Sequence, residues 1–272
     1  MTDAWVKART VAAGVPGAPL VVLAHGLEDA WTSWLPLANC IDPDWRVVAL
    51  DLPWRPGNDY RWRTRSAADW LGEALNLVGA RPDVLVAHSY GANATLDLLC
   101  ALDLRPGPAV MLVCPLYRQP KHPVSWRMFD LARSIFVTHV REGLRARLGS
   151  RAQVLDPAVL QVMADLVLDR VGPSGFVTVF DQFAASGDLQ LFAVEVPTLV
   201  LAGGADPTLS RGAALALAAG MPGADIQIND HYDHFCHIRQ AADVAVQLAD
   251  FVASTSGRPV VGAPAVIGSS SR

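Results

Sequence analysis

Short apolar runs and longer segments of helical period alternate along most of the 272-residue chain. Six runs rich in β-branched residues have strand length, at residues 20–24, 46–50, 84–87, 110–113, 198–202 and 225–228. Four further segments place apolar residues at helical spacing, at residues 66–78, 92–102, 209–219 and 239–252. Because such alternation builds parallel sheets through right-handed crossovers, it predicts an α/β fold with a mostly parallel central sheet flanked by helices. Residues 5–11 have alternating character, which predicts an antiparallel strand at the edge of the sheet.

The segment 115–194 interrupts this alternation. It carries helical patterns at residues 126–140 and 157–171 without a convincing buried strand. We therefore expect an inserted helical cap on an α/β core formed by residues 1–114 and 195–254. Residues 255–272 are rich in Ser, Gly, Pro and Ala and show no period, so we expect a fraying tail without chemistry.

Charge is unevenly distributed along the chain. The total is 22 Lys and Arg against 26 Asp and Glu, a net charge of −4, which argues against nucleic acid as the main partner. Residues 118–151, in the expected cap, nevertheless hold eight Lys or Arg and only two acids. This basic stretch has two interpretations, a solvated helical face or a surface that attracts an anionic substrate or an acidic carrier protein.

The expected cellular location follows from the absence of a signal-peptide pattern and of a membrane-span pattern in the sequence. No basic cluster precedes an apolar run of signal-peptide length, and no uncharged apolar stretch reaches the roughly 18 residues of a membrane span. The four cysteines (Cys40, Cys100, Cys114 and Cys236) lie far apart without a CxxC pair. This spacing favours small buried thiols over disulfides or a zinc site. We expect a cytoplasmic protein with no membrane partner and no metal.

A candidate nucleophile stands at the end of the run 84–87. The sequence Ala87-His88-Ser89-Tyr90-Gly91 puts a serine between an apolar strand and a helical segment, with small residues two positions before and after it. A nucleophile elbow needs those small neighbours because strand and helix approach closely at a strained turn. An ordinary strand-to-helix turn with a serine near the cap is the alternative.

The run 20–24 leads into His25-Gly26-Leu27. A glycine at a strand exit lets the backbone approach a ligand, so the N–H groups of Leu27 and Tyr90 are candidate donors for an oxyanion hole. His25 precedes the glycine, a place that suits a structural hydrogen-bonding residue better than a base.

These motifs, in this order, resemble the α/β-hydrolase family, in particular its cap-bearing, esterase-like branch, over about residues 19–253. The resemblance implies an acid after a late strand and a histidine after the last one. Asp206 follows the run 198–202, and His234-Phe235 follows the run 225–228. We assign these roles to Asp206 and His234.

Alternatives for both roles stay open in the sequence. Asp206 precedes Pro207 and suits a helix cap as well as a catalytic role. Other acids near the C-terminal histidines are Asp225, Asp230 and Asp233, and His231 is the second candidate base. Asp233 stands where the family usually has Gly, so its carboxylate is expected to influence the neighbouring imidazole.

Substrate contacts are predicted from aromatic and basic residues. The loop 54–65 contains four arginines, two tryptophans and a tyrosine, which suit an acidic or conjugated substrate, although a solvated loop with Trp54 and Trp62 pinned to the body is the alternative. Between cap and core we consider Trp31, Trp34, Trp126, Phe129 and Phe136. The residues expected around the substrate are His25, Gly26, His88, Trp54, Arg55 and Trp126.

The chain order Ser89, Asp206, His234 is the order that the resembled family uses. We expect a serine hydrolase that cleaves an ester or thioester of a medium-sized, partly apolar acyl compound, with no cofactor. A serine in place of an aspartate at the elbow disfavours the alkyl-enzyme chemistry of dehalogenases and epoxide hydrolases. The alternative is elimination or cyclisation of a natural-product intermediate on the same fold; the intact set of three residues argues against a non-catalytic binding protein.

Overall fold

The computed structural model describes residues 5–101 and 107–255. Within them, one seven-stranded sheet has the order β1-β3-β2-β4-β5-β6-β7. The strands are β1 (Lys7–Ala12), β2 (Leu20–Ala24), β3 (Arg46–Asp51), β4 (Val84–His88), β5 (Ala109–Val113), β6 (Thr198–Gly203) and β7 (Ala224–Asn229). Strand β1 pairs antiparallel with β3 and every other pair is parallel. The predicted fold class and the antiparallel edge strand are confirmed.

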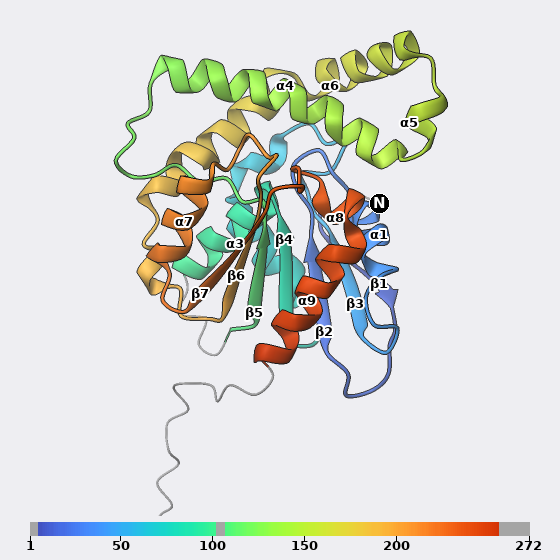
Figure 1. The fold of residues 1–272 in the computed structure, drawn as a ribbon, viewed down its shortest axis with the longest axis vertical. Coiled ribbons are helices and arrows are strands. Elements are labelled where there is room, and N and C mark those ends of the chain that lie inside the picture. Colours follow the sequence, from blue (N-terminus) through green and yellow to red (C-terminus); the bar gives the residue numbers. More distant parts are fainter. Residues whose placement is uncertain (1–4, 102–106, 256–272) are drawn as a thin grey trace, which may run out of the picture.

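Helices cover both faces of the sheet and its upper edge (Figure 1). They are α1 (Leu35–Ala38), α2 (Ala67–Asn76), α3 (Tyr90–Ala101), α4 (Trp126–Leu148), α5 (Arg151–Val154), α6 (Pro157–Ala185), α7 (Arg211–Gly220), α8 (Cys236–Arg239) and α9 (Ala241–Thr255). Short 3-10 turns lie at Trp31–Trp34, Arg61–Thr64, Ser186–Asp188 and Leu191–Ala193. The predicted tail lies outside the described residues, apart from Thr255 at the end of α9.

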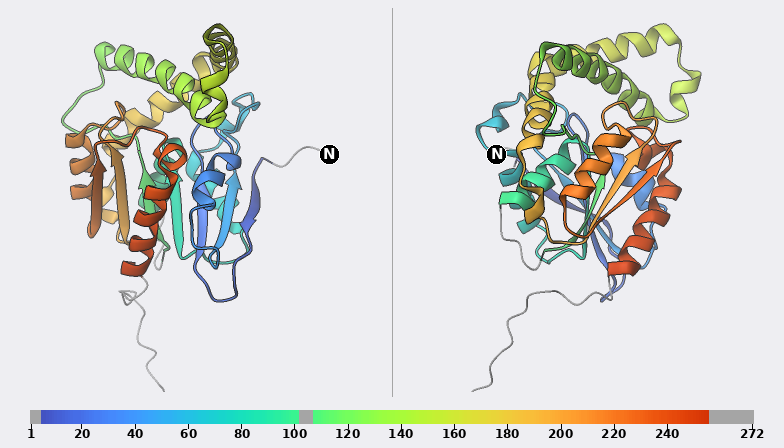
Figure 2. Two further views of the ribbon diagram at one scale, coloured as in Figure 1. Left: turned by 45° about the vertical axis from the view of Figure 1, so that its right-hand side comes forward. Right: turned by 60° about the vertical axis from the view of Figure 1, so that its left-hand side comes forward.

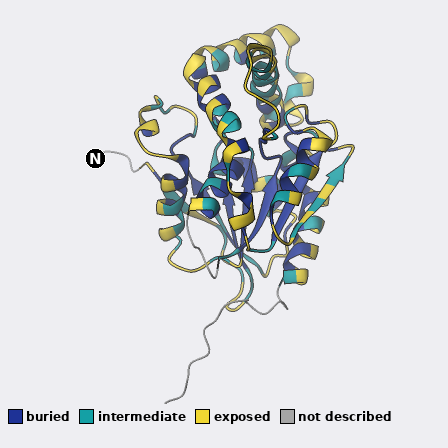
Figure 3. Cartoon of the chain, turned by 90° about the vertical axis from the view of Figure 1, so that its left-hand side faces the viewer, coloured by how far each residue is buried: buried dark blue, intermediate teal, exposed yellow. Residues whose placement is uncertain are grey.

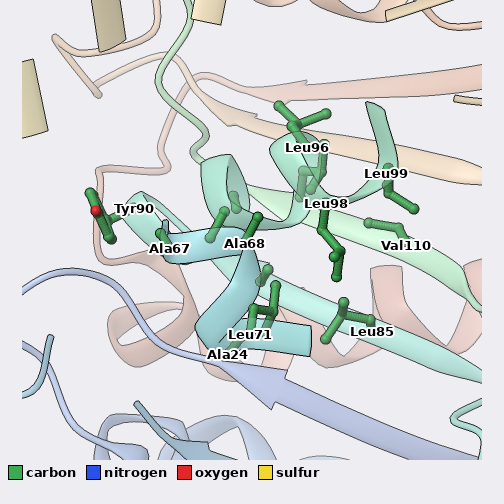
Figure 4. Packing of buried hydrophobic residues seen from close by; sticks show 14 of the residues in the cluster. Ala24, Ala67, Ala68, Leu71, Leu85, Tyr90, Leu96, Leu98, Leu99 and Val110 are labelled. Atoms are coloured by element: carbon green, nitrogen blue, oxygen red, sulfur yellow. The ribbon is translucent and has the colours of Figure 1, made fainter. Parts of the chain in front are cut away.

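Alternate residues of each central strand face two separate apolar cores. In β2, Val22 packs with α2, α3 and α7 on one face, whereas Val21 and Leu23 pack with α1 and α9 on the other. Figure 4 shows the first core around Leu71 and Leu85. Burial of each such side chain contributes roughly 1.5–3 kcal/mol. Because both faces are covered, the strands read as continuous apolar runs, which is why their positions could be predicted.

Three helices, α4, α5 and α6, form a cap above the carboxyl ends of the parallel strands (Figures 1 and 2). Helix α4 exceeds the predicted length, since it continues to Leu148, whereas the predicted segment 157–171 coincides with the part of α6 that precedes its break. Helix α6 is broken at Gly172, which has φ 58°, and resumes at Pro173. Proline cannot donate a backbone hydrogen bond and is tolerated at the start of a helical segment, so this pair marks a kink. The exact limits of the cap, 115 and 194, stay predictions.

Exposed residues are distributed along the outer surfaces of the helices, and the central strands β2, β4, β5 and β6 are buried (Figure 3). The edge strands β1 and β7 are only partly buried. No helix in the described ranges is long and apolar enough to cross a membrane. Cys114 and Cys236 are buried thiols as predicted, but Cys40 is exposed, so the expectation of burial is wrong for that residue. All four cysteines are unpaired.

Candidate active site

Ser89 occupies the sharp turn between β4 and α3. Its φ of 51° lies in the left-handed region, which a non-glycine residue adopts only where the surroundings enforce it. A Cβ on Gly91 would lie 2.5 Å from the carbonyl oxygen of His25, so only glycine permits this approach of helix and strand. Ala87 is fully buried in β4, where its methyl group is accommodated. The predicted elbow geometry is therefore present.

The structure brings Ser89, Asp206 and His234 into one hydrogen-bonded chain. The Oγ of Ser89 lies 2.9 Å from Nε2 of His234, and Nδ1 of His234 lies 2.8 Å from Oδ2 of Asp206. The three residues follow β4, β6 and β7, and the strand register aligns the carboxyl ends of these strands. Ser89 thus meets, at one edge of the sheet, two residues that lie more than 100 positions later in the chain.

Asp206 is almost fully buried and its carboxylate is extensively hydrogen-bonded. Thr208 donates to Oδ1 from its backbone N–H at 2.9 Å and from its hydroxyl at 2.6 Å. Burial alone would raise the pKa of Asp206, but the charge and hydrogen bond of His234 outweigh it, and His139 and Thr208 add to this, so the pKa lies well below its usual range. An ionised Asp206 holds the proton of His234 on Nδ1 and leaves Nε2 free to accept from Ser89.

His139 of α4 was not predicted, yet it covers the same imidazole. Its ring stacks on that of His234 with centroids 4.2 Å apart and planes 10° apart, and its Nε2 lies 3.7 Å from Oδ1 of Asp206. Burial, followed by the charge of His234, lowers the pKa of His139 to about 3. In the sequence His139 is one residue of a helical pattern, so no local signal connects it to His234.

The predicted oxyanion donors are the N–H groups of Leu27, which lines the cavity, and of Tyr90, which follows Ser89 directly, and their role stays a prediction. Leu27 and Gly26 line the same cavity as Ser89. Tyr90 is the first residue of α3, and N–H groups in the first turn of a helix have no partner inside it. A Cβ on Gly26 would lie 3.2 Å from Cβ of Ser89, so glycine keeps the space in front of Ser89 open.

A cavity of about 260 Å³ separates the cap from the carboxyl edge of the sheet. Its floor includes Ser89, His88 and His234, and its charged side includes Glu28, Asp29 and Arg147. The remaining wall is mostly apolar and comes largely from α4 and α6: Met128, Leu131, Ala132, Ile135, Phe136, Val140, Val167, Phe176, Val179, Phe180 and Phe183. An apolar cavity with a few polar groups at one end is the usual form of a small-molecule site.

Several residues expected around the substrate lie elsewhere, which corrects the prediction. Trp54 is only 1% exposed because it packs in the core and donates from Nε1 to the carbonyl oxygen of His25. Arg55 donates to the carbonyl oxygen of Trp5, outside the cavity. Trp126 is 82% exposed, contacts Phe129 of the same helix and is not among the residues that line the cavity. The indole of Trp54 and the guanidinium of Arg55 find their hydrogen-bond partners within the core domain and not in a substrate. Residue type alone therefore gave the wrong position for these side chains.

The remaining expected residues behave differently from one another. His25 is fully buried, donates from Nδ1 to the carbonyl oxygen of Gly26 and accepts at Nε2 from the N–H of Leu52, as suits a structural residue. His88 lines the cavity beside Ser89. Burial lowers the pKa of His88 well below its ordinary value.

The structure distinguishes Asp206 and His234 from the other acids and the other histidine that the sequence left as candidates. His231 is exposed, and Asp225 and Asp230 lie outside the hydrogen-bonded chain. The Asp233 carboxylate accepts from the N–H of Phe235 and pairs with Arg239. Asp206 does not cap the helix that follows it, because α7 begins at Arg211 after its N-cap Ser210; its carboxylate instead accepts from the N–H of Thr208 in the intervening turn.

The fold and the arrangement at its strand ends define the class of alpha/beta hydrolases. A family model described as the Alpha/beta hydrolase family matches residues 21–248. The chain belongs to this family, as the sequence motifs implied.

Individual relatives are distant from this chain. Epoxide hydrolase 4 of Mus musculus is 30% identical over 94 residues, which are 33% of this chain and 26% of that protein. A 2-hydroxy-6-oxononadienedioate/2-hydroxy-6-oxononatrienedioate hydrolase 2 of Pseudomonas putida is 23% identical over 272 residues, covering 87% of this chain and 88% of the relative. The crystal structure of the enol-lactonase from Burkholderia xenovorans LB400 superimposes with a TM-score of 0.62 at 18% identity, covering 91% and 96% of the two chains. The last likeness shows the fold alone.

Proposed function

We propose that this protein is a serine hydrolase that cleaves an ester or thioester of a medium-sized, partly apolar acyl compound. The observation that carries the proposal is the hydrogen-bonded chain Ser89–His234–Asp206 at the floor of an apolar cavity, with distances of 2.9 and 2.8 Å. A nucleophile and base within this reach, with the base oriented by a third group, are the requirements of covalent acyl transfer.

In the first half of the reaction, Ser89 Oγ attacks the acyl carbon while Nε2 of His234 takes the hydroxyl proton. Asp206 stabilises the imidazolium, and the N–H groups of Leu27 and Tyr90 hold the oxyanion. His234 then gives the proton to the leaving oxygen or sulfur, and the acyl group stays on Ser89. In the second half His234 deprotonates water, which attacks the acyl carbon, and the proton returns to Ser89 as the acid leaves.

The cap supports the assignment of a partly apolar acyl group. Its wall of aliphatic and aromatic side chains offers no charge to that part of a ligand, and burying an acyl chain there yields about 0.8 kcal/mol for each methylene group. A cavity of about 260 Å³ suits a compound of moderate size better than a long lipid chain.

The elbow residue also separates this proposal from the epoxide hydrolases among the relatives. Alkyl-enzyme formation uses a carboxylate nucleophile, whereas position 89 is a serine. We therefore propose acyl transfer to Ser89 in preference to epoxide opening.

The proposal is tested with p-nitrophenyl esters and acyl thioesters of increasing chain length, using wild type, Ser89→Ala and Ser254→Ala. Wild type and Ser254→Ala, whose change lies on the exposed side of α9, are expected to turn over at least one series and to be labelled by a fluorophosphonate. Ser89→Ala is expected to lose the label and about 10⁴-fold or more of the activity. Labelling of Ser89 without any turnover contradicts hydrolysis and favours elimination or cyclisation. Absence of labelling in the folded wild type contradicts both.

An acidic carrier protein at the basic stretch of the cap and a cytoplasmic location stay predictions. Four of the eight basic residues in that stretch pair with acids of this chain: Arg118 with Asp188, Arg141 with Asp165, Arg145 with Glu142 and Arg147 with Asp29. The charge offered to a partner is therefore smaller than the composition of the stretch implies.

A further inference from the structure

A second group of polar side chains is buried behind Ser89. Asp29 follows β2, His88 ends β4 and His237 lies in α8, and they are 3%, 2% and 0% exposed. One atom of each, a carboxylate oxygen or a ring nitrogen, lies within 4.8 Å of the corresponding atoms of the other two. None of the three belongs to the hydrogen-bonded chain that activates Ser89.

Four polar atoms of this group have no hydrogen-bond partner among the described residues. These atoms are Oδ2 of Asp29, Nδ1 of His88 and both ring nitrogens of His237. A buried polar atom without a partner costs about 1–3 kcal/mol, and four in one place are uncommon in a folded protein. The group therefore points to an occupant that satisfies them.

Contacts around the group orient two of its members toward a shared centre. Nε2 of His88 donates to the carbonyl oxygen of His234 at 2.7 Å, which leaves a lone pair on Nδ1. Oδ1 of Asp29 accepts from the N–H of Ala30 at 2.9 Å and lies 3.6 Å from Arg147, which leaves Oδ2 for the centre. An imidazole that donates its other N–H to a carbonyl is the arrangement seen around metal-binding histidines.

We infer that Asp29, His88 and His237 bind one divalent transition-metal ion, of which Zn²⁺ is the best match to two imidazoles and one carboxylate. Ligands at about 2.0–2.2 Å from zinc lie about 3–4 Å apart, so side-chain shifts of roughly 1 Å complete the site. Asp29 and His88 also line the cavity, which provides a route for the ion and leaves room for a further ligand.

The group holds three acceptor positions and one donor. The acceptors are Nδ1 of His88, Oδ2 of Asp29 and the unprotonated nitrogen of His237, and the donor is the N–H of His237. A cation is bound by all three lone pairs at once, whereas a single water molecule satisfies them only if the N–H of His237 also donates within the group. Buried water is therefore the competing occupant, and metal titration distinguishes the two.

The position of the site indicates a structural role. Asp29 is two residues after Leu27, His88 is next to Ser89 and His237 is three residues after His234. An ion held by all three would tie together the segments that carry the oxyanion donor, the nucleophile and the base. Such a tie stabilises the folded protein by binding it in preference to the unfolded chain.

A competing group must be distinguished from this one. Cys114, Asp206 and His234 also place ligand atoms within 4.8 Å of one another. Its members are already engaged, because His234 bonds to Asp206 and Ser89. Cys114→Ala therefore serves as the matched control for His237→Gln and Asp29→Asn.

The test is titration of chelator-treated, full-length protein with ZnCl₂ by calorimetry and with CoCl₂ by visible absorption. Wild type and Cys114→Ala are expected to bind one equivalent with micromolar or lower Kd, to show the visible bands of Co²⁺ bound through nitrogen, and to gain Tm with zinc. His237→Gln and Asp29→Asn are expected to bind at least about tenfold more weakly and to gain no Tm.

Two results overturn the inference. One is the absence of saturable binding to folded wild type up to millimolar metal, which indicates buried water alone. The other is binding lost in Cys114→Ala but retained in both His237→Gln and Asp29→Asn. Circular dichroism and fluorophosphonate labelling of Ser89 identify any variant that fails to fold. Asp29→Asn retains an oxygen for the N–H of Ala30, so misfolding of one ligand variant does not imply misfolding of the other.

Discussion

The sheet edge and the cap meet at one cavity, but they are held in place by different forces. Ser89 and Asp206 follow the buried strands β4 and β6, and His234 follows β7, which pairs with β6; these backbone ladders set their positions. The cap contacts the core through ion pairs such as Arg170 with Glu28 at 2.9 Å and Arg239 of the core with Glu142 of the cap at 2.8 Å. It also leaves large apolar residues exposed, among them Val154 at 84% and Leu166 at 63%.

This difference assigns proton transfer to the sheet edge and substrate choice to the cap. Proton transfer depends on distances of a few tenths of an ångström, which buried strands maintain. Partly exposed ion pairs contribute only about 0–1 kcal/mol each, so the cap is less firmly fixed and its lining can change without loss of the fold. We expect changes at the sheet edge to reduce the rate of chemistry and changes in the cap to alter the choice of substrate.

The largest effect is expected for Asp206→Asn at the sheet edge. The amide favours the wrong tautomer of His234, so kcat on the best ester is expected to fall by about 10⁴-fold with the fold retained. Asp230→Asn, an exposed acid near the same loop, is the matched control and is expected to stay at wild-type kcat. Equal losses in both variants would contradict the role of Asp206.

Acid is expected to destabilise both regions through three buried histidines. Burial lowers the pKa of His139 to about 3 and of His237 to about 4, and that of His88 well below 6.5. Below pH 6.5 the unfolded chain therefore binds protons that the folded chain does not, so the free energy of unfolding falls with pH down to about pH 4. The slope is up to about 1.36 kcal/mol per pH unit for each histidine.

Urea unfolding of chelator-treated, metal-free protein at pH 7, 6, 5 and 4 measures this slope, because a bound ion would itself hold His88 and His237 unprotonated. His139→Phe removes the buried histidine of the cap and leaves His88 and His237 of the core. Its plot of unfolding free energy against pH is therefore expected to be shallower by the contribution of one histidine. A stability that stays constant between pH 6.5 and 4 contradicts the burial of neutral histidines.

A change in the cap wall is expected to alter substrate preference. Phe136→Ala enlarges the cavity, so the ratio of kcat/KM for long over short acyl esters is expected to rise by about tenfold, the value of one or two methylene contacts. Phe192→Ala, on a side chain that is 67% exposed, is the control and is expected to leave the ratio unchanged. An unchanged ratio in Phe136→Ala would place the acyl group elsewhere.

The smallest effect is expected at His139, where the cap touches the reactive chain. His139→Ala removes the ring stacked on His234 and admits water, so kcat/KM is expected to fall by about 2- to 10-fold, corresponding to an aromatic pair of about 0.5–1.5 kcal/mol. His139→Phe retains a stacked ring and is expected to recover most of the loss. If both variants lose equally, the imidazole itself is required, and the separation of tasks between cap and core fails at this residue.

Local patterns were sufficient to predict the α/β sheet, its antiparallel edge strand and the elbow at Ser89. The reason is that strand burial has a period of two, helix burial a period near 3.6, and the elbow requires small residues at set positions. Asp206 and His234 required the family resemblance in addition, because several acids and histidines occupy the same loops. Trp126 shows where this approach fails, since helical spacing does not reveal which neighbour a helix will face.

By itself, the sequence determined which segments become strands and helices and which residue types stand at the strand ends, because these depend on neighbours within a few positions. Only the tertiary structure decided that His139 covers His234, that Phe136 and Phe180 form a cavity wall, and that Arg147 is paired with Asp29. These contacts join the cap to core segments that precede and follow it in the sequence. Their geometry depends on how two separately folded surfaces meet, and no periodic pattern records that.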